Sequence, residues 1–182
     1  VDENARITGI EVNSRRPKSK NIFMKILIIK RDFLLNSIDE AFARGDHDIM
    51  KDILVRSLDI TNVFAYKFDG YVRTVDDVRS YYDANMDMLK EDIRKEIFNP
   101  RRPIYTKIKD QVPTRYCNNA SVHNSLIADG CEIEGDVKDS IIFRGVNIGK
   151  NAKISNSIVM QDSIIQAGCE LSYAILDKEV TI

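Results

Sequence analysis

A five-residue phrase with apolar residues at its first and fifth positions recurs four times in the last third of the chain. The four copies span residues 122–126, 137–141, 154–158 and 171–175, and an aliphatic residue follows each of them. Six-residue units lie between the copies, and each unit opens with an aliphatic residue and carries a small residue four positions later. The circuits from Ile142 to Val159 and from Val159 to Leu176 both contain six plus six plus five residues. Circuits of equal length return in register and stack aliphatic residues upon one another.

The repeat predicts a solenoid of parallel strands with one coil per circuit. Three short flat faces per turn make a triangular prism, as in left-handed parallel β-helices built from hexapeptide repeats. The small fifth residue of each unit, such as Ala152 after Ile148, is needed where the corner turns and the cross-section narrows. We expect this β-helix at residues 120–182, after a linker at 99–119 that contains the structure-breaking run Pro100-Arg-Arg-Pro103.

Residues 1–98 follow a different pattern, in which short apolar runs alternate with stretches of helical periodicity. A helix is predicted from Phe33 to Arg44, with Asp32 as its N-cap and Gly45 at its C-terminal end. Strands are also predicted at 7–12, 22–29, 62–68 and 71–75. Three further helices are predicted: one that begins at Asp48, one at 75–89 and one at 90–96. Alternating strands and helices indicate an α/β domain.

Composition and charge exclude some classes of function. The chain has 182 residues, of which 43% are hydrophobic and 30% charged, as in ordinary globular proteins. With 27 basic and 28 acidic residues the net charge is −1, so no overall field attracts nucleic acid or an anionic membrane. No apolar run approaches the roughly 20 residues that cross a bilayer.

The three cysteines are interpreted as structural residues. Cys117, Cys131 and Cys169 are odd in number and lack the spacing of metal sites. Cys131 and Cys169 occupy equivalent corners of the repeat, so we expect small buried side chains rather than redox centres or metal ligands. Reduced cysteines indicate a cytoplasmic protein.

Both ends of the sequence indicate a longer protein. Val1 is not an initiator residue, and Ile182 falls where another six-residue unit is due. A solenoid that stops on an open coil exposes strand edges. We therefore expect the β-helix to be truncated and the chain to be a fragment.

Three stretches of the chain resemble one enzyme family. They are His47-Asp-Ile-Met-Lys-Asp-Ile53, the run to Leu89 that begins Gly70-Tyr-Val-Arg-Thr-Val75, and Arg102-Pro-Ile-Tyr-Thr106. With the repeats, they resemble bacterial ADP-glucose pyrophosphorylases (glucose-1-phosphate adenylyltransferases) over essentially the whole chain. The resemblance implies that residues 1–98 are the C-terminal part of a Rossmann-like nucleotidyltransferase domain. It also implies a role in glycogen biosynthesis, in which ATP and glucose 1-phosphate form ADP-glucose and pyrophosphate.

The chain departs from the family pattern at positions that bind substrate and metal. Catalytic members carry Gly-Tyr-Trp-Arg-Asp-Val-Gly-Thr, whose Asp helps to hold the catalytic Mg²⁺, whereas this chain has Thr74 at that position. A neutral hydroxyl is a poor replacement for a carboxylate as a Mg²⁺ ligand. Phe23 stands where the family has a small serine in the glucose phosphate site, and the lysine of a Glu-Lys-Pro triplet is missing.

These departures resemble the regulatory-type, non-catalytic subunit found beside an active subunit in some Gram-positive bacteria. The resemblance then implies a catalytic subunit as partner, in a hetero- or homo-oligomer that is a tetramer by family. Mg²⁺ and ATP would serve that partner, and this fragment would hold no cofactor.

Six residues are candidates for binding. Asp48 falls where the family has an acidic contact to the glucose ring, although a helix N-cap is the alternative. Lys25 replaces a glycine beside the phosphate site, and its ammonium could reach an anion or extend into solvent. A basic loop could bind a phosphorylated effector, because clustered cations favour a dianion, or could simply be solvated. Its cations are Arg15, Arg16, Lys18 and Lys20.

Two further positions allow alternatives of different chemistry. Thr74 with Asp76 and Asp77 could rebuild a metal site, but a helix cap before Val78 is favoured, so we expect neither a metal ligand nor a catalytic residue. His123 could be the general base of a hexapeptide-repeat acyltransferase, yet its place in the five-residue phrase indicates an outward-facing side chain. The alternatives to a regulatory subunit are therefore an active adenylyltransferase with a rearranged pocket, an acyltransferase and a purely structural scaffold.

Overall fold

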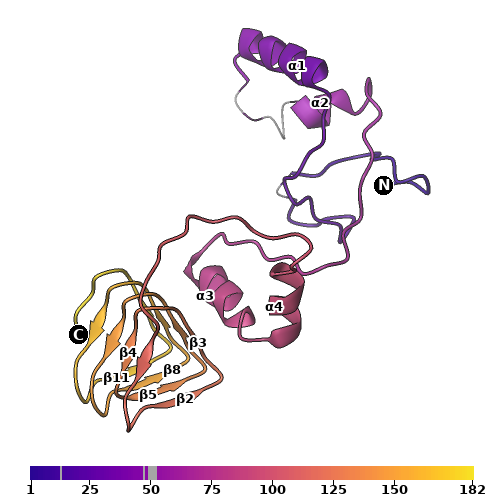
Figure 1. Cartoon of the computed structure of the whole chain (residues 1–182). Coiled ribbons are helices and arrows are strands. Elements are labelled where there is room, and N and C mark those ends of the chain that lie inside the picture. Colours follow the sequence, from indigo (N-terminus) through magenta and orange to yellow (C-terminus); the bar gives the residue numbers. More distant parts are fainter. Residues whose placement is uncertain (13, 47, 49–52) are drawn as a thin grey trace. The chain divides into compact units, whose positions relative to one another are not determined.

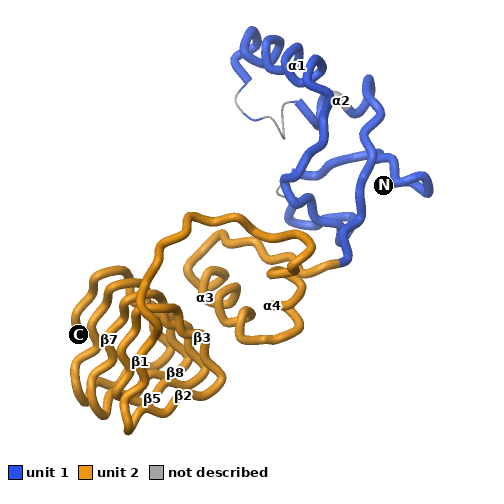
Figure 2. Tube along the Cα trace, viewed as in Figure 1, with its two compact units in different colours: residues 1–69 blue, residues 70–182 orange. Residues whose placement is uncertain are grey.

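The structure is a computed structural model that describes residues 1–12, 14–46, 48 and 53–182 (Figure 1). The chain divides into two compact units, Val1–Asp69 and Gly70–Ile182 (Figure 2). The second unit contains the repeats together with two helices. The boundary therefore lies within the region expected to be one α/β domain, and the helical stretch before the linker belongs with the solenoid.

The repeats form a parallel β-solenoid of about four turns, with one four-stranded sheet on each of three faces (Figure 1). The first sheet contains β1 (Arg115–Tyr116), β4 (Glu132–Ile133), β7 (Asn147–Ile148) and β10 (Ile164–Ile165). The second contains β2 (Ser121–His123), β5 (Asp136–Lys138), β8 (Lys153–Ser155) and β11 (Glu170–Ser172). The third contains β3 (Leu126–Ile127), β6 (Ile141–Ile142), β9 (Ile158–Val159) and β12 (Ile175–Leu176). The predicted solenoid is confirmed, and its left-handed sense stays a prediction.

Strand register follows the circuit lengths. Ile142 pairs with Val159, and Val159 pairs with Leu176, as the equal circuits predicted. Ile133, Ile148 and Ile165 form another column, and each is 0% exposed. Burying such a side chain contributes about 1.5–3 kcal/mol, so the stacked columns are the main source of stability of this unit.

The small corner residues are also buried. Val146, Ala152 and Ser163 are 0% exposed and Cys131 is 2% exposed. Cys169 is only partly buried, although it packs against the core. The expectation of small buried corner residues therefore holds for Cys131 and in part for Cys169. All three cysteines are free thiols.

Serine at the fourth position of the five-residue phrase builds a ladder of hydrogen bonds. The buried Ser140 hydroxyl donates to the Lys138 carbonyl oxygen at 2.7 Å and accepts the Ser157 N–H at 3.1 Å. The Ser157 hydroxyl repeats the pattern with Ser155 and Ala174. Each buried hydroxyl thus donates within its own coil and accepts from the next coil, which satisfies its polar atoms.

Two helices precede the solenoid in the second unit. They are α3 (Val78–Asp87) and α4 (Glu91–Ile97), which confirm the predicted helical stretches. The Asp77 side chain caps α3 by accepting the Ser80 N–H, and the Ser80 hydroxyl accepts the Asp77 N–H in return. This capping box fixes where α3 begins. Residues 100–114 form neither helix nor strand, whereas β1, which lies within the predicted linker 99–119, already pairs with β4 of the solenoid.

The first unit contains α1 (Arg31–Arg44) and the short α2 (Val55–Ser57). Gly45 ends α1 in the left-handed conformation, at φ 75°, as predicted. The predicted N-cap was wrong: Lys30 precedes the helix, and Asp32 lies in its first turn. A carboxylate there still interacts favourably with the helix dipole. The helix predicted to begin at Asp48 falls largely on residues outside the described part.

No helix in the described residues is long and apolar enough to cross a bilayer.

The predicted strands at 7–12, 22–29, 62–68 and 71–75 were wrong for the described residues. Their one pairing is the antiparallel bridge between Arg6 and Phe64. Ile22, Ile26 and Ile28 are 83%, 70% and 102% exposed. An apolar run becomes a strand only when a neighbouring strand supplies backbone partners and a packing face, and none lies beside Ile22–Ile28 in this part of the structure.

A pair of adjacent isoleucines tests the stacked core. Ile165→Ala should lower the free energy of unfolding by about 2–5 kcal/mol, because its side chain is fully buried in a column. Ile164→Ala in the same strand is the matched control, since Ile164 is 46% exposed, and it should cost less than about 1 kcal/mol. Urea unfolding followed by far-ultraviolet circular dichroism measures both. Equal losses would contradict the inward orientation of Ile165.

Candidate functional site

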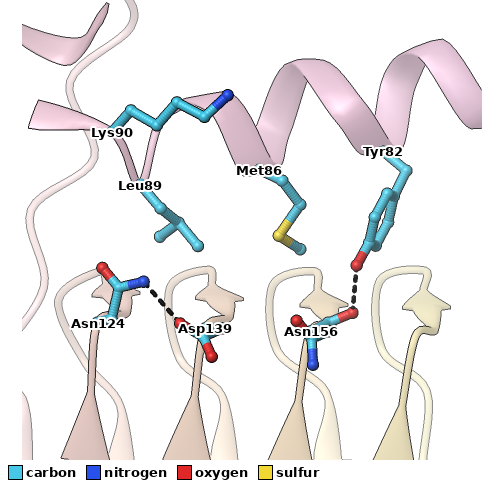
Figure 3. A pocket seen from close by; sticks show the side chains of 7 residues that line it. All are labelled: Tyr82, Met86, Leu89, Lys90, Asn124, Asp139 and Asn156. Atoms are coloured by element: carbon cyan, nitrogen blue, oxygen red, sulfur yellow. Dashed lines mark hydrogen bonds between the residues drawn. The ribbon is translucent and has the colours of Figure 1, made fainter. Parts of the chain in front are cut away.

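A groove of about 510 Å³ lies where α3 runs along one corner of the solenoid (Figure 3). Tyr82, Met86, Leu89 and Lys90 line one side, and all four come from α3 or the turn that follows it. Asn124, Asp139 and Asn156 line the other side and come from three successive coils. The groove therefore joins the helical segment to the repeat through residues of both.

The solenoid side of the groove is a row of residues in the left-handed backbone conformation. Asn124, Asp139 and Asn156 occupy the third position of the five-residue phrase, with φ of 42°, 47° and 47°. Asn and Asp tolerate this conformation better than other non-glycine residues. The Asn124 side-chain amide donates to Asp139 Oδ1 at 2.6 Å, which ties two coils together. We call this row the corner ladder.

The spacing of α3 side chains matches the spacing of the coils. Tyr82 and Met86 are four residues apart on α3, which a helix converts into about 6 Å, and Leu89 follows three residues later in the turn after α3. Neighbouring parallel strands lie about 4.8 Å apart. The side chains of Leu89, Met86 and Tyr82 therefore follow one another along the corner ladder at intervals similar to those of the coils, as Figure 3 shows. The Tyr82 hydroxyl donates to the Asn156 carbonyl oxygen at 2.7 Å, which anchors one end of the contact.

Asp87 lies beside the groove residues on α3 and is the most buried charged residue of this region, at 5% exposure. Its Oδ2 accepts from the Tyr71 hydroxyl at 2.8 Å and from Arg73 Nε at 3.1 Å, and Arg73 Nη2 donates to the same oxygen. Its Oδ1 accepts from Lys90 Nζ at 2.8 Å. The carboxylate thus joins α3 to the extended residues that precede the helix.

In this cluster the pKa of Asp87 is lowered and the pKa values of Arg73 and Tyr71 are raised. Burial alone raises the pKa of Asp87, but hydrogen bonds from Lys90, Arg73 and Tyr71 outweigh it and lower the pKa to about 2. The pKa of Arg73 is raised by its hydrogen bonds to Asp87 and Tyr71. Burial raises the pKa of Tyr71. Asp87 is therefore ionised and Arg73 and Tyr71 are protonated near neutral pH.

Thr74 lies one residue beyond this cluster and is exposed. Asp77 is occupied as the cap of α3, and its hydrogen bonds with Ser80 lower the pKa of its carboxyl. The backbone N–H of Asp76 also donates to the Ser80 hydroxyl at 3.0 Å. The cap favoured over a rebuilt metal site is thus the arrangement that forms.

The candidate sugar and effector contacts lie in the first unit. Asp48 and Lys25 are exposed, and Lys25 has a left-handed backbone with φ of 58°. The basic loop is exposed too, and the Lys18 N–H donates to Glu11 Oε2 at 3.2 Å. The other cations of that loop are Arg15, Arg16 and Lys20. None of these candidates lines the groove, so their binding roles stay predictions.

His123 is exposed, in register with Lys138 and Ser155 on the second sheet. The outward orientation inferred from its place in the phrase is therefore confirmed. Its backbone carbonyl oxygen accepts from the Asp139 N–H and the Ser125 hydroxyl. These contacts involve the main chain of the corner and leave the imidazole on the surface.

One cluster beside the first sheet was not predicted from the sequence. Cys117, Glu132 and Glu134 place a thiol and two carboxylates within 4.8 Å of one another. Arg115 Nη1 donates to Glu132 Oε1 at 2.9 Å, so one carboxylate already has a cationic partner. The strand pairing puts Arg115 beside Glu132 and Tyr116 beside Ile133, so Cys117 and Glu134 both directly follow paired strands. Asp87 was also missed, because its contacts depend on where α3 lies. The corner ladder was missed too, although Asn or Asp at the third position of three copies of the phrase could have indicated it.

The chain is similar to a hexapeptide-repeat family model and to curated adenylyltransferases and GlgD. The family model described as "GlmU-like, C-terminal hexapeptide" matches residues 110–182. The chain is 34% identical over its full length to a glucose-1-phosphate adenylyltransferase of Desulfitobacterium hafniense, of which it covers 46%. It is 36% identical over 87% of its length to the glycogen biosynthesis protein GlgD of Bacillus subtilis, of which it also covers 46%. A glucose-1-phosphate adenylyltransferase of Acetivibrio thermocellus is 33% identical over 99% of the chain and is 43% covered. The chain spans about half the length of these curated relatives.

The ionised Asp87 should make stability depend on acid. Its folded-state pKa lies below the ordinary value of 3.8, so its contribution is complete above about pH 4 and is lost as the pH falls through about 2. A pKa lowered from 3.8 to about 2 corresponds to about 2 kcal/mol. The difference in free energy of unfolding between wild type and Asp87→Asn should therefore shrink over this range.

Urea unfolding at pH 2, 3, 4 and 5 measures that difference. Glu91→Gln is the control, because Glu91 forms an exposed pair with Lys95 on α4, and exposed pairs contribute little. A wild-type advantage over Asp87→Asn that stays constant from pH 5 to pH 2 would contradict the assigned ionisation.

Proposed function

The chain belongs to the family of glucose-1-phosphate adenylyltransferases and GlgD proteins, and from that premise we propose that it serves in a regulatory, non-catalytic subunit. The subunit would control an adenylyltransferase that converts ATP and glucose 1-phosphate into ADP-glucose and pyrophosphate for glycogen biosynthesis. Residues 1–69 and the helices of the second unit would then be the C-terminal part of a Rossmann-like nucleotidyltransferase domain. The solenoid would be the interaction module.

One residue carries this proposal. Thr74 stands where catalytic members carry the aspartate that holds Mg²⁺, and a neutral hydroxyl cannot supply the charge that nucleotidyl transfer needs from a metal ligand. Overall similarity does not separate the two classes, because the chain is 34% identical to an adenylyltransferase and 36% identical to GlgD. The distinction therefore depends on the chemistry of position 74, with Phe23 in the sugar phosphate site as a second departure.

The solenoid is suited to subunit contacts. Three flat, repeated faces give a rigid surface whose strands are held by stacked aliphatic columns, and repeat surfaces commonly bind other chains. The partner in this proposal is the catalytic subunit, in a hetero- or homo-oligomer in the cytoplasm. Arg15, Arg16, Lys18 and Lys20 would bind a sugar phosphate or similar effector, and Asp48 and Lys25 would be remnants of the substrate site.

The main alternative is an active adenylyltransferase, which the full-length similarity to such enzymes favours. It requires another residue to take the place of the aspartate missing at position 74. The acyltransferase alternative depends on His123, whose exposed imidazole lies on the second sheet. That alternative gives no role to residues 1–98, which align with the adenylyltransferases.

A rate assay tests the regulatory proposal. The full-length protein that contains this chain should form ADP-glucose at least about 100-fold more slowly than a catalytic family member, because an electrostatic contact to the reacting phosphates is missing. Added to that catalytic subunit, it should change the rate or the effector response by about 5- to 150-fold, the usual range of allosteric coupling. ADP-glucose formation with and without the partner is measured.

The controls separate the alternatives. His123→Ala should leave both readings unchanged, whereas loss of an acetyl-CoA-dependent activity in that variant would support the acyltransferase. Rapid ADP-glucose formation by the full-length protein alone would rule out the regulatory proposal. If neither the rate nor the effector response of the catalytic subunit changes when this protein is added, the protein is a structural scaffold.

A further inference from the structure

We infer that Asp87 is a positioning residue that transmits the docking of α3 on the corner ladder to residues 70–74. This inference rests on the proposed function for its significance, because residues 70–74 contain the position at which catalytic members hold their metal. The physical link itself is a property of the second unit alone. It would make the solenoid a regulator of the segment next to the reaction rather than a passive support.

The first part of the link is the convergence of side chains on one carboxylate. Tyr71 and Arg73 lie two residues apart on the same segment, and both donate to Asp87 Oδ2. Two neighbouring donors on one acceptor fix the direction of the segment as well as its distance from α3. Charge-assisted hydrogen bonds of this kind are about twice as strong as neutral ones, so Asp87 is the principal side-chain anchor of residues 71–73.

The second part of the link is that Asp87 is adjacent to the groove. It directly follows Met86, and Lys90 both lines the groove and donates to Asp87 Oδ1 at 2.8 Å. A helix is rigid over this length, since consecutive hydrogen bonds fix its backbone. A shift of Met86 relative to the coils therefore moves Asp87 by a similar amount.

Helix α4 supports the same geometry. Glu96 Oε1 accepts the Tyr71 N–H at 2.8 Å, and Arg94 Nη1 donates to the Met88 carbonyl oxygen at 2.8 Å, at the end of α3. The segment is thus attached to the two helices, whereas the Tyr82 hydroxyl attaches α3 to the solenoid. Changes at the corner ladder can reach residues 71–73 through α3.

A double-mutant cycle on the 182-residue chain tests the link. Tyr82→Phe removes the hydrogen bond to Asn156, and Asp87→Asn removes the charge at the centre of the cluster. Hydrogen exchange measured by nuclear magnetic resonance reports on two protons of the segment, the Tyr71 N–H and the Arg73 Nε–H. Both are donors in the described network.

Tyr82→Phe should speed exchange of both protons by about three- to tenfold, as expected when one net hydrogen bond supporting a local closed state is lost. Asp87→Asn should speed exchange of Arg73 Nε–H by at least about tenfold, because a charge-assisted bond is lost. In the Asp87→Asn background, Tyr82→Phe should have no further effect on the two protons. That non-additivity is the signature of transmission.

The neighbouring Tyr81 provides the matched control. In the described part of the chain its hydroxyl makes no hydrogen bond, so Tyr81→Phe should leave both protons unchanged. Should Asp87→Asn prove unstable, Lys90→Met removes only the Oδ1 contact and should show the same coupling at reduced size.

Two results would overturn the inference. In one, Tyr82→Phe speeds exchange of the Asp77 N–H, which reports on the start of α3, without affecting Tyr71 or Arg73. In the other, the effects of Tyr82→Phe and Asp87→Asn simply add. Neither reading depends on enzymatic activity, so a failed partner assay and a failed exchange experiment remain distinguishable.

Discussion

Each coil of residues 115–182 must return the chain to the same aliphatic columns, and this constraint underlies the rest of the second unit. A circuit of 17 residues brings Ile142 above Val159 and Val159 above Leu176. Once the columns are in register, the corners have little freedom. The fourth position of the phrase takes small residues, and the two buried ones, Ser140 and Ser157, bond between coils. The third position must accept a left-handed backbone.

The regular corners give α3 a surface to pack on. A row of left-handed residues repeats at the spacing of parallel strands, and helical side chains three and four residues apart repeat at nearly the same spacing. Tyr82, Met86 and Leu89 therefore line the groove opposite residues of three successive coils. Helix and solenoid are matched by geometry, and the Tyr82 hydroxyl adds a specific anchor at Asn156.

The charged side chain of Asp87 then connects α3 to Tyr71 and Arg73 in the segment that precedes the helix. Asp87 is buried but ionised, since three donors offset its desolvation, and removing one partner of such a cluster leaves an uncompensated charge. Thr74 directly follows Arg73 in the chain and so lies next to this cluster. In the proposed regulatory subunit the metal-binding carboxylate is replaced, while Arg73 and Tyr71 keep the surrounding architecture. The regulatory role would then use the family's scaffold without its chemistry.

The sequence determined the solenoid and the ends of two helices, because each depends on local periodicity or on a capping residue. Short-range rules set where α3 begins at Asp77 and where α1 ends at Gly45. The tertiary structure decided which apolar runs become strands: Ile22, Ile26 and Ile28 have the pattern of a strand but no neighbour to pair with in the described residues. It also decided the groove, which forms when α3 packs on the coils, and the Asp87 cluster, which forms when α3 packs on the segment that precedes it. Periodicity describes how a segment can fold, whereas a contact between distant segments depends on where both of them lie.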